Sequence, residues 1–417
     1  MLTEAFDSVL DESECSKRLG SGSFGTVYKA CLQTNPCESC IVLKLSDTQR
    51  DKRGALKNFD AEFAAMKSIF TALSSFDEQS VTLNMKTLVP KPVKTFRIIE
   101  GGESMPVMAM EYARGLELKA TLGDLRFTRD LVFQGTLAQL VALLFSLTRK
   151  FPEFQHMDLN QGNIMLADPM LTRIGINDLG VLSPRDLGCP SLTLLDFGLA
   201  LFRHADLAVH DDIVIDKAGK EVRYSIQWFF DTSTVQAYKS YDFKMIVYNF
   251  SMFLTDSSTP LYAKFWTWVF SCVFATSFDS ASLASLSPGD KQKAMYSYVR
   301  YFFRNPDKIQ GRSIYGGAEL VDAVQTVQDS NGMRVFALVL QAAFGLGDTP
   351  TVASLQGLLD LAGALADLGS GPSYPMFQRF DWGLIITHPF IKACFKSEIP
   401  KQEAYFPLSD DVTQMEE

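Results

Sequence analysis

The spacing of hydrophobic residues changes along this chain, and the change divides it into two parts. In the first part, short apolar segments predict strands at Thr26–Tyr28 and Ile41–Leu45, and a further strand begins the segment Val107–Leu118. Between them, Asn58–Leu73 carries apolar residues at helical spacing. From Tyr241 onward the spacing is helical. The pattern predicts an α+β protein with a β-rich N-terminal part and a mainly helical C-terminal part.

The helical part is divided by segments rich in small and turn-forming residues. Apolar residues predict buried helices at Phe265–Ala275, Val335–Phe344 and Leu355–Leu368. Ser280–Asp290 and Gly369–Pro375 are predicted linkers. The first of these helices is the most apolar run and is too short to span a bilayer, so we expect no transmembrane segment.

Three polar residues interrupt apolar segments near the middle of the chain. Asp158 is followed five positions later by Asn163 within HMDLNQGNIML, and Asp196 opens the sequence DFG. This arrangement is typical of phosphoryl transfer, in which Asp158 would orient the attacking hydroxyl while Asn163 and Asp196 would each hold Mg²⁺. Taken alone, the first segment has another interpretation as a plain turn, because Asn, Gln and Gly are turn formers.

A glycine-rich segment, RLGSGSFGTVYKA, lies near the N-terminus. Glycines let the backbone approach phosphate oxygens and offer N–H groups to them. A dinucleotide-binding loop would need a helix directly after the glycines, but Thr26 to Tyr28 favour a strand. We therefore predict a phosphate-binding hairpin, with Val27 covering the adenine. Its other residues are Gly20, Ser21, Gly22, Ser23, Phe24 and Gly25.

Lys44 is the one charge in an apolar strand and is costly to bury without an anionic partner. Nucleotide phosphates would be that partner, with Glu62, on or beside the inward stripe of the helix at 58–73, holding the amine. Taken singly, Lys44 is a snorkelling strand residue and Glu62 a solvated helix residue. Their order relative to the glycine and aspartate motifs favours the catalytic interpretation.

The segment VMAMEYARGLEL predicts a strand that leads into a loop. In a two-lobed enzyme this would be the hinge, where backbone groups of Glu111 and Ala113 contact the adenine edge. Met110 would line the back of that pocket, and Glu117 would reach a ribose hydroxyl. Without flanking nucleotide motifs, the segment would be a plain strand and turn.

The ordered set GxGxxGxV, IVLK, helix Glu, MEY, HxDxxxxN and DFG resembles the catalytic domain of eukaryotic protein kinases. The resemblance implies a bilobed fold, ATP and Mg²⁺ as cofactors, and Asp158, Lys44 and Glu62 as catalytic residues. It also implies an N-terminal extension at 1–12, an N-lobe at 13–112, a C-lobe at 113–395 with an insert at 167–191, and an acidic tail at 396–417.

Within that family, the chain resembles the haspin branch of serine/threonine kinases. The long insert before DFG, the missing Ala-Pro-Glu and the phrase FQHMDLNQGNIML carry this likeness, and Asp242 resembles the helix aspartate that braces the catalytic loop. Met157 replaces the usual Arg, so phosphorylation of the activation loop is not the expected switch. Asn160 replaces a Lys, which leaves charge at the transferred phosphate less well compensated.

The haspin resemblance implies a basic peptide or histone tail as the protein substrate. Acidic residues after DFG would attract its Arg and Lys side chains, although a solvated acidic loop is the equal alternative. These residues are Asp206, Asp211, Asp212 and Asp216.

The formal net charge of −9 argues against direct binding of nucleic acid. Seven scattered cysteines make a disulfide framework unexpected and favour an intracellular location, in the cytoplasm or nucleus. Cys37 and Cys40 form a single CxxC, which lacks the further ligands of a zinc site. The acidic N-terminus does not resemble a signal peptide. We expect a monomer without membrane contact.

Two other functions remain open from the sequence. DLNQGN also resembles the DLHPGN loops of small-molecule phosphotransferases with a kinase-like fold, although DFG and MEY count against this interpretation. Met157 and Asn160 raise the alternative of a pseudokinase that binds ATP and acts as a scaffold.

Overall fold

The computed structural model describes the chain in segments. These are residues 17–22, 25–31, 40–45, 59–74, 85–100, 103–122, 124, 129–151, 154–156, 158–168, 173–176, 179–198, 200, 212–215, 221–224, 241–277, 284–291, 330–344, 351, 353–354, 357 and 381–396. Several predictions concern residues outside these segments: those on Ser23, Phe24, Cys37, Met157, Asp206, Asp211 and Asp216, the extension at 1–12, most of the helix at 355–368, the linker at 369–375, and the tail beyond residue 396.

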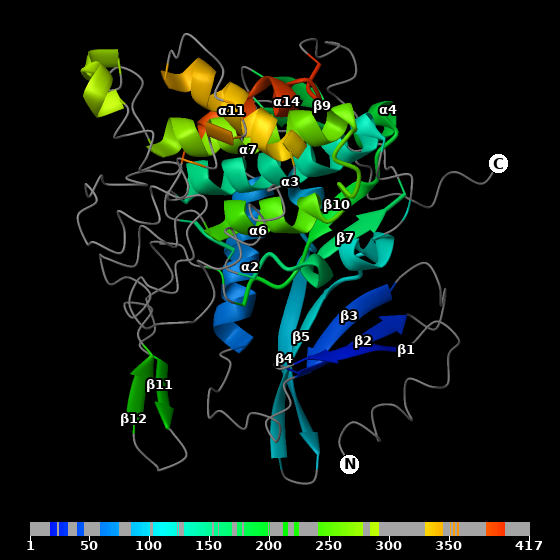
Figure 1. Ribbon diagram of the computed structural model, residues 1–417. Coiled ribbons are helices and arrows are strands. Elements are labelled where there is room, and N and C mark those ends of the chain that lie inside the picture. The colour runs from blue at the N-terminus through cyan, green and yellow to red at the C-terminus, as the bar shows by residue number, and fades with distance from the viewer. Residues whose placement is uncertain are drawn as a thin grey trace, which may run out of the picture.

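A five-stranded antiparallel sheet forms the N-terminal part, in the order β1-β2-β3-β5-β4 (Figure 1). The α+β prediction, with strands first and helices later, is therefore confirmed. The strands are β1 Lys17–Gly22, β2 Gly25–Cys31, β3 Cys40–Leu45, β4 Pro92–Glu100 and β5 Glu103–Glu111.

Helix α2, Phe59–Ser74, packs against β4 and β5 of this sheet. Its buried side includes Met66, Ile69 and Leu73, which recur at helical spacing and belong to the main core. Glu62 lies one turn before Met66 and is also buried. The amphipathic pattern therefore turns this acidic residue toward the interior.

The C-terminal part is built around α3, Asp130–Lys150 (Figure 1). Its residues from Phe133 to Leu144 are all buried, as expected of a helix that is largely apolar on every side. The helices that accompany it are α6 Tyr241–Ser251, α7 Pro260–Ser277, α11 Ser330–Phe344, α13 Trp382–Thr387 and α14 Pro389–Lys392.

By length and composition α3 could cross a membrane, and the sequence analysis overlooked it in favour of the run at 265–275. The most apolar window of α3 is, however, 78% buried inside the structure. Such burial is typical of the core helix of a folded domain.

Aromatic rings join α3 to the helices around it. Phe133 packs edge-to-face against Phe250 of α6 and Phe265 of α7, at centroid distances of 5.5 and 5.6 Å. Phe265 also contacts Trp268 and Phe390, so four helices meet at these rings.

A three-stranded sheet, in the order β10-β7-β6, carries the central motifs. Its strands are β6 Leu116–Glu117, β7 Ile164–Ala167 and β10 Ser191–Leu194. Gly115 has φ +114°, and a Cβ there would lie 2.1 Å from the Leu166 carbonyl oxygen, so only glycine fits beside β7. The sheet places the catalytic-loop motif and DFG at neighbouring strand ends.

The predicted insert forms a hairpin and one helical turn, namely β8 Ile174–Ile176, β9 Gly180–Leu182 and α4 Pro184–Leu187. Val181 exchanges both backbone hydrogen bonds with Lys396, at 2.9 Å each, which fastens the insert to the C-terminal segment. At the other end, the side chain of Gln139 on α3 donates to the Pro190 carbonyl and accepts from Leu192 N–H. The insert is thus part of the scaffold.

A second hairpin consists of β11 Asp212–Ile215 and β12 Glu221–Tyr224.

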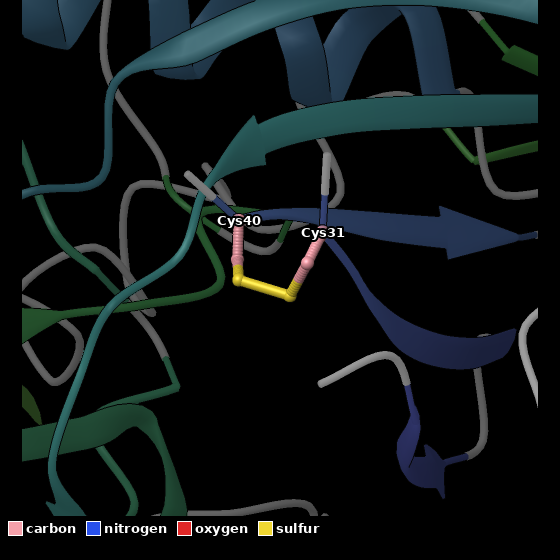
Figure 2. Close-up of a disulfide and its surroundings, with 2 residues drawn as sticks. All are labelled: Cys31 and Cys40. Carbon is pink, nitrogen blue, oxygen red and sulfur yellow. A yellow bond between two sulfur atoms is a disulfide. The ribbon is translucent and has the colours of Figure 1, made fainter. Parts of the chain in front are cut away.

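Cys31 and Cys40 form a disulfide that the sequence analysis did not predict. That analysis grouped Cys40 with Cys37 and expected no disulfide framework. Cys31 ends β2 and Cys40 begins β3 (Figure 2), and the strand register places them opposite each other with Cα atoms 4.0 Å apart. The sequence showed a short spacing but not this register. Among the described cysteines, Cys189, Cys272 and Cys394 are free and buried.

The predicted linker at 280–290 is wrong where it is described, because residues 284–285 and 288–291 are helical. Ser287 caps the second of these turns, accepting from Asp290 N–H and donating to its carboxylate. Pro288 then occupies the first helical position, which proline tolerates. Ser-Pro-Gly-Asp was a helix start rather than a linker.

Phe265→Ala should lower the free energy of unfolding by about 3–5 kcal/mol, because it opens a cavity where four helices meet. Leu338→Ala is the matched control, since Leu338 is 56% exposed on α11 and its truncation should change stability by only about 0.5 kcal/mol. Denaturant titration of both variants measures the difference. Equal effects would contradict this account of the core.

Digestion without reductant by a protease that cleaves after glutamate should recover a peptide pair joined through Cys31 and Cys40, because Glu38 lies between these two residues and the strand register brings them together. Reduction before digestion is the control and should separate the pair. Recovery of both residues as alkylated free thiols from the unreduced protein would contradict the disulfide.

Candidate phosphoryl-transfer site

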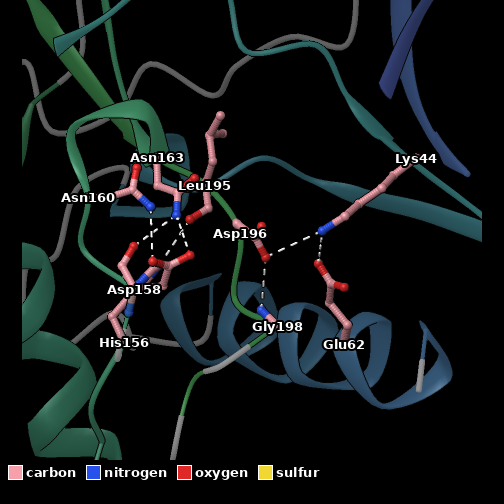
Figure 3. A network of polar contacts seen from close by, with 9 residues as sticks. All are labelled: Lys44, Glu62, His156, Asp158, Asn160, Asn163, Leu195, Asp196 and Gly198. Atoms are coloured by element: carbon pink, nitrogen blue, oxygen red, sulfur yellow. Dashed lines mark hydrogen bonds and ion pairs between the residues drawn. The ribbon is translucent and has the colours of Figure 1, made fainter. Parts of the chain in front are cut away.

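A buried ion-pair network lies where the sheet meets the helical part. Lys44 Nζ donates to Glu62 Oε1 at 2.6 Å and lies 3.3 Å from Asp196 Oδ1 (Figure 3). The side chains of Lys44 and Glu62 are only 9% and 2% exposed, whereas that of Asp196 is 27% exposed. A lysine on β3, a glutamate on α2 and the DFG aspartate are therefore brought together from three separate parts of the sequence.

The strand register explains which residues surround Lys44. Val27 and Met108 are its direct partners on β2 and β5, and directly opposed residues share a face of the sheet. Two positions along β3, Val42 lies on the same face opposite Met110. Val27, Val42 and Met110 therefore form an apolar surface beside the buried ammonium.

The described glycines lie at the end of the β1–β2 ladder, between two antiparallel strands as the sequence predicted. Gly22 pairs with Gly25 at the end of the ladder, and Gly20 pairs with Val27. A Cβ built at Gly20 meets nothing within 4 Å. The backbone at Gly20 thus has open space beside it.

Asp158 is held by two side-chain amides. Asn160 Nδ2 donates to its Oδ1 and Asn163 Nδ2 donates to its Oδ2, each at 2.9 Å (Figure 3). Asn163 Nδ2 also reaches the Asp158 carbonyl at 2.8 Å. Because both carboxylate oxygens accept hydrogen bonds, the carboxylate has a defined orientation.

Asn160 has a second contact that the sequence analysis did not foresee. Its Oδ1 accepts from Gly162 N–H at 2.9 Å and caps the short helical turn η4, Gln161–Asn163. The sequence indicated only that a lysine was missing here. In the structure, the asparagine links the shape of the turn to the position of Asp158.

Asp196 has φ +57° and is the only described residue other than glycine with a positive φ. This left-handed conformation is strained for most residues but more accessible to aspartate, whose side chain can hydrogen-bond locally. Its Oδ1 accepts from Gly198 N–H at 3.2 Å. The turn directs the carboxylate toward Lys44.

His156 connects the two motifs, a role that the sequence analysis did not assign. Its Nε2 lies 3.0 Å from the Leu195 carbonyl oxygen, and its Nδ1 accepts from Asp158 N–H at 3.3 Å. These partners require a neutral ring with the proton on Nε2. Burial lowers the pKa of His156, although the nearby carboxylates of Asp196 and Asp158 raise it.

The catalytic loop is also fastened to α6. The Asp242 carboxylate accepts from His156 N–H at 2.6 Å and is buried. The sequence analysis compared Asp242 with an aspartate that braces the catalytic loop of the resembled family. In the structure, Asp242 contacts the loop that contains His156 and Asp158.

The predicted hinge residues lie at the end of β5 and beyond it. Glu111 N–H donates to the Lys91 carbonyl at 2.9 Å, so this N–H is already engaged and does not face an adenine. Met110 and Ala113 are half-buried. Glu117 is exposed on β6, and its carboxylate lies 3.7 Å from a Cβ built at Gly162, beside the catalytic loop.

The donor set suits Mg²⁺ and a polyphosphate. The polar centre contains one ammonium and three carboxylates, from Glu62, Asp158 and Asp196, so anionic side chains outnumber the cation. Magnesium is usually bound by one or two oxygen ligands together with substrate phosphates rather than by an all-protein cage. The described segments contain no cluster of three or more His, Cys, Asp or Glu that could hold a metal ion.

No protein-family model matches this chain. One curated relative is similar over a short segment: a probable LRR receptor-like serine/threonine-protein kinase of Arabidopsis thaliana, 44% identical over 72 residues. The match covers 15% of this chain and 7% of the relative. It is a similarity to a protein kinase. It supports a relationship to protein kinases. Because the match covers so little of the relative, it does not show that this chain has the relative's activity.

The protonation of His156 should contribute to the pH dependence of the free energy of unfolding. Because burial holds its pKa below the ordinary 6.5, the unfolded chain binds this proton first as pH falls. The free energy of unfolding therefore decreases as pH falls below about 6.5. His156→Gln should make the decrease in Tm from about pH 7 to about pH 5 shallower.

His388 provides a comparison for this measurement, since burial lowers its pKa as well. His388→Gln should remove a separate share of the same pH dependence and leave the His156 share intact. Thermal melts at several pH values measure both. A pH dependence in His156→Gln identical to that of the unchanged protein would contradict the buried neutral ring.

Proposed function

We propose that this chain is an ATP- and Mg²⁺-dependent protein kinase with a bilobed fold that phosphorylates serine or threonine. The observation that carries the proposal is the buried Lys44–Glu62 pair, extended by Asp196 and placed near an Asp158 carboxylate that two amides orient. The similarity to part of a serine/threonine kinase supports the same conclusion.

Each residue of the site has a role that its geometry supports. Lys44, positioned by Glu62, binds nucleotide phosphates, and the backbone of the β1–β2 hairpin lies against them. Asp196 and Asn163 would hold Mg²⁺. Asn163 would use its amide oxygen, because its amide nitrogen donates to Asp158. When bound, the metal neutralises charge on the phosphates.

Asp158 would act on the acceptor. Its fixed carboxylate can accept a hydrogen bond from a serine or threonine hydroxyl and orient that oxygen toward the terminal phosphate. Val27, Val42 and Met110 supply the apolar surface for the adenine. Positioning and electrostatic stabilisation thus account for most of the proposed rate enhancement.

A basic peptide, such as a histone-like tail, is the proposed substrate class. The chain has a formal net charge of −9, which favours cationic partners. The exposed Glu117 carboxylate beside Gly162 offers one anionic contact next to the catalytic loop. The proposed closeness to haspin kinases rests on the insert at 167–191 and on the loop sequence FQHMDLNQGNIML.

A small molecule is the second candidate acceptor, and Asn160 is the observation that favours it. Serine/threonine kinases of this family usually have a lysine there, whereas Asn160 is committed to Asp158 and to the turn. Phosphate transfer from radiolabelled ATP to histones, a basic peptide library and a metabolite panel separates the candidates. Transfer to none of these acceptors, together with Mg-ATP binding, would favour a pseudokinase instead.

Asp196→Asn and Lys44→Met should each reduce phosphate transfer by at least about a hundredfold, because each removes a charge that the bound phosphates and metal require. Lys94→Met is the matched control, since Lys94 is exposed on the edge strand β4 and should keep full activity. Circular dichroism should show that all three variants are folded. Full activity in either folded site variant would refute the site assignment.

A further inference from the structure

Two polar residues lie seven positions apart on α6, and both face the catalytic loop. Asp242 accepts from His156 N–H at 2.6 Å, and Asn249 Nδ2 donates to the Leu159 carbonyl at 2.6 Å. Seven residues are close to two helical turns, so both side chains project from the same side of α6. The two contacts lie on either side of Asp158.

Asn249 is an unusual residue for its surroundings. It is 1% exposed, and its neighbours Ile246 and Phe250 on α6 belong to the apolar core. Its Oδ1 has no hydrogen-bond partner among the described residues. Burying an amide with half of its polar atoms unpaired opposes folding, so stability alone does not explain this asparagine.

The two contacts lie at the two ends of the loop segment. Asp242 is fixed to the His156 N–H and Asn249 to the Leu159 carbonyl. The two positions are about 10.5 Å apart along the α6 axis. One helix therefore holds the segment that contains Asp158 at both ends.

The Leu159 side chain is fully buried and anchors its own position, but a buried apolar side chain does not determine how the adjoining peptide is rotated. The hydrogen bond from Asn249 to the Leu159 carbonyl does so, because it selects one direction for that carbonyl. The Leu159 peptide lies directly between Asp158 and Asn160, which are themselves hydrogen-bonded to each other.

We propose that Asn249 is a positioning residue for phosphoryl transfer: by holding the Leu159 peptide from the scaffold, it sets the place of the Asp158 carboxylate. This inference rests on the proposed function, since it requires Asp158 to act on an acceptor hydroxyl. Asn249 touches neither nucleotide nor acceptor and acts only through the loop. Gln161 adds a weaker contact to the same place, from its Nε2 to the Asn249 carbonyl at 3.4 Å.

The first test is Asn249→Leu, which keeps the branching and the number of side-chain heavy atoms and replaces an incompletely paired polar group with an apolar one. We expect kcat for phosphate transfer to fall about tenfold to a hundredfold, since small displacements of a catalytic group have effects of this size. KM for ATP should change less than about twofold, because Lys44 and the glycine hairpin remain in place. Tm should change little, because the lost hydrogen bond to the Leu159 carbonyl is offset by removal of the unpaired amide oxygen.

Tyr248→Phe is the matched control. It removes one polar group from the neighbouring, half-buried position of α6 and should leave kcat, KM and Tm unchanged. A kcat for Asn249→Leu within about twofold of the unchanged protein would overturn the proposal. A parallel loss of kcat, ATP affinity and Tm would also overturn it, because that pattern indicates a structural role only.

The second test combines Asn249→Leu with Asp158→Asn. If Asn249 acts through Asp158, its substitution should lower the residual rate of the Asp158→Asn enzyme by less than about twofold. The same fold-loss in both backgrounds would overturn the proposal. If the unchanged protein transfers phosphate to no acceptor, the proposed function fails and this inference falls with it, whereas transfer with full-rate Asn249→Leu overturns this inference alone.

Discussion

The buried pair between Lys44 and Glu62 is the interaction on which the rest of the site depends. Neither charge could remain at its position without the other, because an isolated charge in the interior is expensive while a hydrogen-bonded pair is tolerated. The pair joins β3 to α2, and the 3.3 Å approach of Asp196 adds the DFG segment. Electrostatics therefore holds three distant elements in one arrangement.

The carboxylates of this network differ in their access to solvent, which bears on the proposed binding of a polyphosphate with Mg²⁺. Asp158 and Asp196 are more accessible than Glu62, so they are the carboxylates that can reach ligands. Strain at Asp196 is confined to one residue and is offset by its hydrogen bond from Gly198. His156 stays neutral between the two motifs and connects them without adding charge.

The helical core supplies the rigidity that these polar contacts require. Aromatic rings join α3, α6, α7 and α14, and α6 in turn holds the loop that contains Asp158 through Asp242 and Asn249. Gln139 on α3 performs a comparable task at β10, which leads into Asp196. Buried hydrogen bonds from the core helices thus fix the positions of the polar loop and strand that form the site.

The sequence alone determined the local structure: the glycine hairpin, the Lys44 strand and the helix of Glu62, because these depend on residue type and on periods of a few positions. Tertiary structure decided the rest. The pairing of Cys31 with Cys40 required a strand register, and the contact of Asn249 with Leu159 joins residues 90 positions apart. Such partners are chosen by packing of whole elements, which the pattern of a single segment does not contain.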